Sequence, residues 1–197
     1  ALSTDLMILD ALGEGLTTEE TKSRLRDYAP DVLALSVLTP SVSTATDIAS
    51  DLKQANGTLS IWGGIHPSIF PRRALEERVA DIVVRGDGES NLIRVLSTYS
   101  QNRDIQATKE LLSTSQGISV MVDGRIADND IFLGEVLNTL PQPAYEEFPL
   151  DKYFWQGKKT ITVESGRGCV GKCTYCESPA YYQQTFRQKS PEKFLEL

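Results

Sequence analysis

All three cysteines of the 197-residue chain, Cys169, Cys173 and Cys176, lie within eight residues of one another in a C-x3-C-x2-C pattern. The segment 166–176 also contains three glycines, which allow a short loop to curl around a bound centre. Thiolates at this spacing can converge on one inorganic group. A [4Fe–4S] cube needs four ligands, so three cysteines would leave one iron open to a small molecule. The spacing therefore predicts an iron–sulfur cluster that takes part in chemistry.

Three other readings of the cysteines remain open. Unrelated buried cysteines are one, although such residues would not usually cluster within eight residues of a polar, glycine-rich loop. A disulfide would leave one thiol over, and nothing else in the sequence indicates an oxidising compartment. A structural zinc site takes four protein ligands, usually in two pairs, and the single histidine, His66, lies far upstream. The iron–sulfur site is the favoured interpretation.

The loop resembles the cluster loop of radical S-adenosylmethionine (SAM) enzymes, because Tyr175 stands just before the third cysteine. In that family the open iron binds SAM, and an electron from the cluster cleaves SAM to a 5′-deoxyadenosyl radical. The resemblance implies that Cys169, Cys173 and Cys176 hold a [4Fe–4S] cluster and that Tyr175 lies near the adenine of SAM. It also implies that the loop follows the first strand of a (β/α) barrel, which the alternating, β-branched residues 159–164 are expected to form.

The resemblance to radical SAM enzymes covers only residues 159–197. Ser190 is expected to cap the first helix after the loop, with Pro191 at the first helical position. Because a full barrel takes ~250 residues, we expect the chain to be a fragment of a longer enzyme.

Residues 1–127 alternate between strand and helix patterns. Strands are expected over 5–9, 31–38, 59–62 and 81–84, and helices over 17–27 and 45–56 and after Ser90. Thr17 and Glu20 form a capping box for the first helix. Alternation along residues 118–127 around Asp123-Gly124 predicts a closing hairpin. The pattern predicts an α/β fold with a Rossmann-like, doubly wound parallel sheet.

Small, glycine and hydroxyl residues follow the predicted strands. In open α/β sheets ligands bind at the carboxyl ends of the strands, although the same residues are also good turn formers. The candidate ligand contacts after these strands are Thr39, Ser41, Gly63, Gly64, His66, Gly86, Gly88 and Glu89.

The segments 36–38, 63–64 and 85–89 together resemble the cobalamin-binding domain that precedes some radical SAM barrels. The resemblance implies that Ser36 and Leu38 line a channel for the cobalamin nucleotide tail, and that Gly63 and Gly64 let the tail pass. The D-x-H-x-x-G motif of cobalamin mutases is absent, and so are the strand and helix that open this family's domain. Some relatives carry a similar domain without cobalamin.

His66 is expected to line the pocket rather than to ligate cobalt. A ligating histidine needs a partner that fixes its tautomer, and no carboxylate lies within six residues of His66. The family that the chain resembles commonly leaves that face of cobalt without a protein imidazole.

The sequence predicts three parts: a cobalamin-binding-like domain over 1–127, a proline-containing linker over 128–158, and the beginning of a radical SAM barrel over 159–197. The net charge of −7 disfavours nucleic acid or an anionic membrane as a partner. With no signal peptide and no apolar run near the ~20 residues of a membrane span, we expect a cytoplasmic, anaerobic setting.

Together the resemblances imply a cobalamin-dependent radical SAM methyltransferase acting on an unactivated carbon of a small molecule or peptide. In such enzymes one SAM methylates cob(I)alamin and a second supplies the radical, with flavodoxin or ferredoxin as reductant. Two alternatives stay open: a radical SAM cyclase of the anaerobic porphyrin-cyclase kind, and a non-catalytic iron–sulfur or cobalamin carrier. No catalytic side chain is assigned from the sequence.

Overall fold

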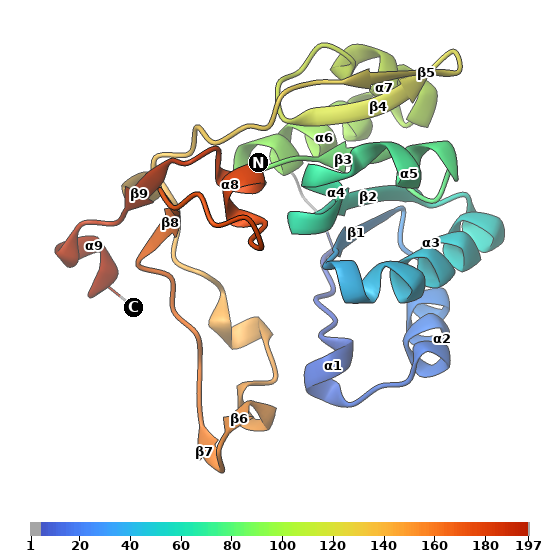
Figure 1. Ribbon diagram of the computed structural model, residues 1–197. Helices are drawn as coiled ribbons and strands as arrows, with labels where there is room; N and C mark the ends of the chain where they lie inside the picture. Colours follow the sequence, from blue (N-terminus) through green and yellow to red (C-terminus); the bar gives the residue numbers. More distant parts are fainter. Residues whose placement is uncertain (1–4, 197) are drawn as a thin grey trace.

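The computed structural model describes residues 5–196, and its main body is a five-stranded sheet in the order β1-β2-β3-β4-β5 (Figure 1). Its strands are β1 (Val32–Ser36), β2 (Leu59–Gly63), β3 (Ile82–Val84), β4 (Ile118–Val122) and β5 (Arg125–Asp128). The first three strands run parallel, and the predicted hairpin adds β4 and β5 antiparallel at one edge. The predicted α/β sheet is confirmed, but it is mixed rather than wholly parallel. The outer ends of the predicted domains, 1–4 and 197, lie outside the described residues.

Helices cover both faces of this sheet. They are α1 (Ala11–Glu14), α2 (Thr18–Tyr28), α3 (Val42–Asn56), α4 (Ile65–Ile69), α5 (Pro71–Glu76), α6 (Glu89–Asn102) and α7 (Ile105–Leu112). Buried side chains of α2, α3 and α5 pack on one face, whereas those of α6 and α7 pack on the other. This is the doubly wound layering that the alternation of strands and helices predicts.

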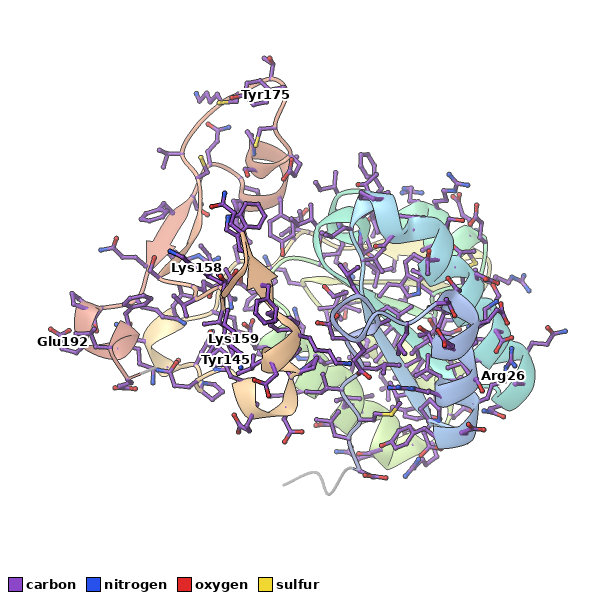
Figure 2. The ribbon with its side chains drawn as sticks, turned by 90° about the horizontal axis from the view of Figure 1, so that it is seen from below. Arg26, Tyr145, Lys158, Lys159, Tyr175 and Glu192 are labelled. Atoms are coloured by element: carbon purple, nitrogen blue, oxygen red, sulfur yellow. The ribbon has the colours of Figure 1, made fainter. Side chains whose placement is uncertain are left out.

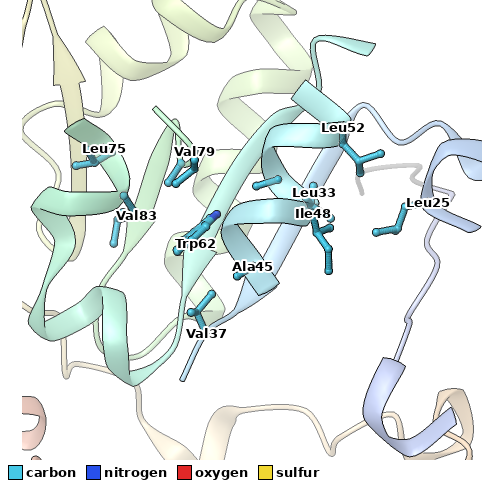
Figure 3. Packing of buried hydrophobic residues seen from close by; sticks show 13 residues of the cluster. Leu25, Leu33, Val37, Ala45, Ile48, Leu52, Trp62, Leu75, Val79 and Val83 are labelled. Carbon is cyan, nitrogen blue, oxygen red and sulfur yellow. The ribbon is translucent and has the colours of Figure 1, made fainter. Parts of the chain in front are cut away.

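The core consists of two apolar clusters, one on each face of the sheet. Trp62 of β2 and Leu52 of α3 belong to the first cluster (Figure 3), whereas Leu59 and Ile61 of β2 belong to the second. Successive side chains of a strand point to opposite faces, so a strand covered on both faces is apolar almost throughout. The indole nitrogen of Trp62 donates a hydrogen bond to Ser60 Oγ (3.2 Å), which satisfies the one polar atom of this buried ring.

The signals at the ends of α2 and α3 act as expected, whereas the helix expected after Ser90 begins at Glu89, so that Ser90 lies inside the helix and does not cap it. Thr17 Oγ1 accepts from the Glu20 amide (3.2 Å) and Glu20 Oε2 accepts from the Thr17 amide (2.8 Å), so the predicted capping box is confirmed. Helix α3 ends at Gly57, whose φ of 68° is left-handed and therefore favours glycine.

The prediction of a strand over residues 5–9 is wrong. Met7 and Leu9 do pack against the first core cluster while Leu6 is exposed, so the alternation is real. Within the part of the chain that the structure describes, however, no strand lies beside this segment to form a ladder of hydrogen bonds.

The remaining segments are short. They are the 3-10 turns η1 (Thr39–Ser41), η2 (Leu137–Thr139), η3 (Tyr145–Glu147) and η4 (Leu150–Lys152), the strands β6 (Phe154–Trp155), β7 (Lys158–Lys159), β8 (Gly166–Gly168) and β9 (Phe186–Gln188), and the helices α8 (Ser178–Tyr182) and α9 (Pro191–Phe194). The β6–β7 hairpin projects away from the main sheet (Figure 1). Ser190 Oγ accepts from the Lys193 amide (3.2 Å) with Pro191 as the first residue of α9, which confirms the predicted cap.

Two details of the predicted barrel start are wrong. Only Lys159 of the predicted strand 159–164 is in a strand, and Ile161 and Val163 are exposed. An interior barrel strand needs neighbours on both sides, and residues 5–196 place none beside 160–164. In addition, α8 and β9 come between the cysteine loop and the helix that Ser190 caps.

Among the described helices, none is both long and apolar enough to cross a bilayer.

Leu52→Ala should lower the free energy of unfolding by about 2–5 kcal/mol, because Leu52 is fully buried between α3 and the sheet and its loss leaves a cavity. The matched control is Leu111→Ala on α7, whose side chain is 62% exposed and should cost less than about 1 kcal/mol. Urea denaturation followed by circular dichroism measures both. Equal losses for the two variants would contradict this account of the core.

Candidate functional site: the cysteine loop and the carboxyl edge of the sheet

The cysteine loop lies between β8 and α8 and presents its sulfur atoms near the surface. Cys169 and Cys173 are exposed and Cys176 is half-buried. The Gly171 amide donates to Cys169 Sγ (3.4 Å), and the Ser178 amide donates to Cys176 Sγ (3.4 Å). The backbone of the loop is therefore suited to cysteines that act as ligands.

The donor set fits an iron–sulfur cluster in its chemistry. A Cβ on Gly171 would lie 3.3 Å from Cys169 Sγ and 3.8 Å from Cys173 Sγ, so a glycine leaves the space between two thiols open. Soft thiolates are the ligands that iron–sulfur clusters take. Across residues 5–196, however, no three histidine, cysteine or carboxylate side chains stand close enough to enclose a metal ion. The three cysteines share one loop without meeting at one point, and their role as ligands stays a prediction.

Strands β8 and β9 form the base of the loop. Arg167 lies directly opposite Arg187, and Gly168 lies opposite Phe186. Gly168 has a φ of 107°, and a Cβ there would overlap the carbonyl oxygen of Thr185. Close approach of the two ends of the loop therefore requires glycine at position 168.

The two facing arginines share one carboxylate, Asp87, which lies in the turn after β3. Its side chain is 2% exposed. Asp87 Oδ1 accepts from Arg167 Nη1 (3.1 Å) and from Arg187 Nη2 (3.1 Å), and Oδ2 accepts from the Glu135 amide (3.1 Å). The base of the cysteine loop is thus tied to the carboxyl end of a central strand.

Glu89 and Glu164 are further carboxylate partners of Arg167. Arg167 Nη2 pairs with Glu89 Oε1 (2.5 Å) and its Nε pairs with Glu164 Oε1 (3.0 Å). Burial acts to raise the pKa of Asp87 and of Glu89, but the hydrogen bonds from the arginines outweigh it and lower both pKa values. Both carboxylates are therefore ionised at neutral pH.

A second link joins the turn after β3 to α8. The Tyr181 hydroxyl donates to the Gly86 carbonyl oxygen (2.9 Å), while the Gly86 amide donates to Ser68 Oγ (3.0 Å). Burial raises the pKa of Tyr181 to about 12, so this hydroxyl keeps its proton. Sequence analysis missed the roles of Asp87, Arg167 and Tyr181, because partners 80 to 100 residues apart leave no local signal.

The predicted ligand contacts after β1 and β2 do meet at one edge of the sheet. Gly64 has a φ of 94°, and a Cβ there would lie 2.9 Å from the Val37 amide nitrogen and 3.2 Å from Ser36 Oγ. Glycine at this position therefore lets the turn after β2 lie against the end of β1. Leu38 is 55% exposed beside it, so this edge presents an apolar side chain among small residues.

Comparison with known proteins shows what this edge belongs to. Residues 5–96 match the model of the B12 binding domain. This part of the chain is therefore similar to a B12 binding domain, and it is called the B12-binding domain below. This match, the relatives and the solved structure described next together confirm that the chain resembles radical SAM enzymes with a cobalamin-binding domain.

Two curated relatives align over 98% of the chain. An uncharacterized methyltransferase of Pyrococcus horikoshii is 27% identical over 195 residues, and the anaerobic magnesium-protoporphyrin IX monomethyl ester cyclase of Cereibacter sphaeroides is 23% identical over 202 residues. The chain spans 41% and 31% of their lengths, respectively.

A solved structure shows the same fold. The radical SAM methyltransferase TsrM of Kitasatospora setae, solved with cobalamin and a [4Fe–4S] cluster, superposes with a TM-score of 0.67 at 15% identity. The match covers 98% of this chain and 39% of TsrM.

The remaining predicted residues of the B12-binding domain divide into two groups. Thr39 and Ser41 follow the carboxyl end of β1, and His66 follows that of β2. There His66 Nδ1 is 3.1 Å from Thr39 Oγ1. Gly86 and Glu89 instead contact the segment that carries the cysteines, and a Cβ on Gly88 would meet no atom within 4 Å. Contact of these residues with cobalamin stays a prediction.

His66 has a hydroxyl partner rather than a carboxylate. Burial lowers the pKa of His66, and the nearby charge of Arg73 lowers it further, so the ring is neutral at pH 7. The ring also lies in tilted contact with Phe70, with 5.4 Å between ring centroids. These contacts seat the ring on its own domain.

Tyr175 lies at the tip of the cysteine loop and points outward (Figure 2), with 91% of its side chain exposed. Its contact with the adenine of SAM stays a prediction.

Gly168→Ala should open the base of the cysteine loop, because the added Cβ overlaps Thr185 and the backbone angle is unfavourable for alanine. We expect trypsin to cleave after Arg167 and Arg187 about tenfold faster than in the parent protein, since strain of 1–3 kcal/mol favours local opening. Gly88→Ala is the matched control, because a Cβ there meets only open space. If both variants were cleaved at the rate of the parent, the strain at Gly168 would not support the loop.

Proposed function

We propose that this chain is part of a cobalamin-dependent radical SAM enzyme that transfers a methyl group to an unactivated carbon. The observation that carries the proposal is the attachment of the cysteine loop to the B12-binding domain through Arg167–Asp87 and Tyr181–Gly86. The attachment places the loop beside the carboxyl end of the sheet, where ligands of open α/β sheets bind. One chain thus presents a thiol-rich loop and a cofactor edge next to each other.

Cys169, Cys173 and Cys176 would hold the [4Fe–4S] cluster, and backbone amides already donate to the sulfur atoms of Cys169 and Cys176. When bound, the cluster supplies the electron that cleaves SAM, and cobalamin supplies a carrier for the methyl group. Tyr175, exposed at the tip of the loop, would contact the adenine of SAM.

Ser36 and Leu38 would line the channel for the nucleotide tail of cobalamin. Gly63 and Gly64 keep that side free of bulk, since a Cβ on Gly64 would press on the end of β1. His66 would form part of the pocket wall through its hydrogen bond to Thr39.

A second candidate function is cyclisation or ring rearrangement, which the likeness to the magnesium-protoporphyrin cyclase favours. Methyl transfer is favoured by the likeness to the P. horikoshii protein and to the cytidylyl-2-hydroxyethylphosphonate methyltransferase of Streptomyces wedmorensis, 24% identical over 92% of the chain. Incubating the full-length protein with methyl-labelled SAM separates the two, since only methyl transfer carries the label into product.

The partners follow from the same proposal. The substrate would be a small molecule or a peptide, and the electron would come from a flavodoxin or ferredoxin in a reducing cytoplasm. Exposed Lys158 and Lys172, on the β6–β7 hairpin and in the cysteine loop, would attract the acidic surface of such a donor.

Anaerobic reconstitution of the full-length protein with iron and sulfide should give about four irons per chain, with the EPR signal of a reduced [4Fe–4S] cluster. Cys173→Ser should abolish most of the iron uptake, because a hydroxyl is a poor substitute for a thiolate. Thr174→Ala, in the same exposed loop, is the control and should keep the cluster. One bound zinc and no iron uptake would contradict the proposed cluster.

Cobalt(II) EPR of the cobalamin-loaded protein should show no splitting from a protein nitrogen, because Phe70 packs against the His66 ring and the hydrogen-bond partner of the ring is the Thr39 hydroxyl rather than a carboxylate. His66→Ala should leave the cobalt spectrum unchanged. Nitrogen splitting that disappears in His66→Ala would instead make His66 a cobalt ligand.

A further inference from the structure

We propose that Asp87 is a positioning residue that fixes the cysteine loop relative to the cofactor edge of the B12-binding domain by neutralising Arg167 and Arg187. The identity of the two cofactors rests on the proposed function, whereas the clamp itself rests on contacts within the chain. Asp87, Arg167 and Arg187 are called the Asp87 clamp below.

The register of β8 and β9 places two positive charges opposite each other. Arg167 and Arg187 are direct cross-strand partners, and like charges at such positions destabilise a strand pair. The pair consists of only three residues on each strand, so it has few hydrogen bonds with which to resist the repulsion.

The side chains of the Asp87 clamp are largely shielded from water. The side chains of Arg167 and Arg187 are 17% and 22% exposed, and that of Asp87 is 2% exposed. The Nε atom of Arg187 is buried and has no hydrogen-bond partner within residues 5–196. Water screens these partly buried charges poorly, so removal of the shared carboxylate leaves the two facing arginines without the group that bridges them.

The two arginines depend on Asp87 to different degrees. Arg167 also pairs with Glu89 and Glu164. Within the described residues Arg187 pairs with no carboxylate other than Asp87. Arg187 is therefore the side chain whose charge becomes harmful when Asp87 is neutralised.

Asp87 lies between the two candidate cofactor sites. Asp87 follows β3, whose neighbour β2 ends at Gly63 of the predicted tail channel. Arg167 lies two residues before Cys169. The Asp87–Arg167 ion pair thus connects the carboxyl end of the sheet to the residue that lies two positions before the first cysteine. Loss of this pair should release the loop without unfolding the sheet.

The test uses amide hydrogen exchange of the full-length protein without added cofactors. Asp87→Asn keeps the shape of the side chain and removes its charge. Exchange at the β8 and β9 amides should become at least about tenfold faster, since breaking a buried ion pair is strongly destabilising. Exchange in β1 and β2 should stay at the parent rate.

A second variant tests the charge logic directly. Asp87→Asn combined with Arg187→Gln removes one of the facing cations and should return β8–β9 exchange to within about threefold of the parent rate, since coupled neighbours are not additive. Asp31→Asn is the matched control, because it breaks the exposed pair with Arg103 (3.0 Å) and should change nothing. Unchanged β8–β9 exchange in Asp87→Asn overturns the proposal. So does an equal increase in β1 and β2 that the second substitution fails to reverse.

The effect on the cofactors is measured by pulsed EPR between a reduced cluster and cobalt(II) in protein loaded with both. The distance distribution should broaden in Asp87→Asn and narrow again in the double variant. A parent protein that binds no cluster or no cobalamin would refute the proposed function and leave the exchange result to decide the clamp. A distribution that is the same in loaded parent and loaded Asp87→Asn would refute the positioning role alone.

Discussion

A buried carboxylate between two facing arginines is the constraint on which the C-terminal half of this structure depends. Arg167 and Arg187 could not stay opposite each other across so short a strand pair without Asp87. The ion pairs lower the pKa of Asp87 in spite of its burial, so the carboxylate stays charged where its charge is needed. Buried ion pairs of this kind contribute more to a fixed arrangement than to net stability.

The B12-binding domain follows a different principle, because apolar packing rather than charge holds it together. Its central strands β2 and β3 are buried on both faces, and small residues such as Gly63 and Gly64 stand at the less buried carboxyl end of β2. A rigid sheet with an open edge suits a large, flat cofactor. The same edge also provides the turn that contains Asp87, so one structural element serves both halves of the chain.

Local sequence signals were sufficient wherever structure depends on neighbouring residues. The Thr17–Glu20 capping box, the Asp123-Gly124 hairpin and the Ser190 cap all formed as predicted, because each is completed within a few residues. Strand prediction failed over 5–9 and 160–164, where the apolar alternation is present but the described chain brings no neighbouring strand. A strand is stable only in a ladder, and one segment cannot supply it.

The sequence by itself determined the α/β class, the concentration of thiols in one loop and the glycine and hydroxyl residues at the strand ends, because composition, spacing and periodicity are local properties. Only the tertiary structure decided that Glu89 pairs with Arg167, that His66 meets Thr39, and that Asp87 joins two segments 80 and 100 residues away. The physical reason is that an ion pair depends on distance in space and on burial, and neither quantity is fixed until the sheet has formed and the loop has packed against its edge.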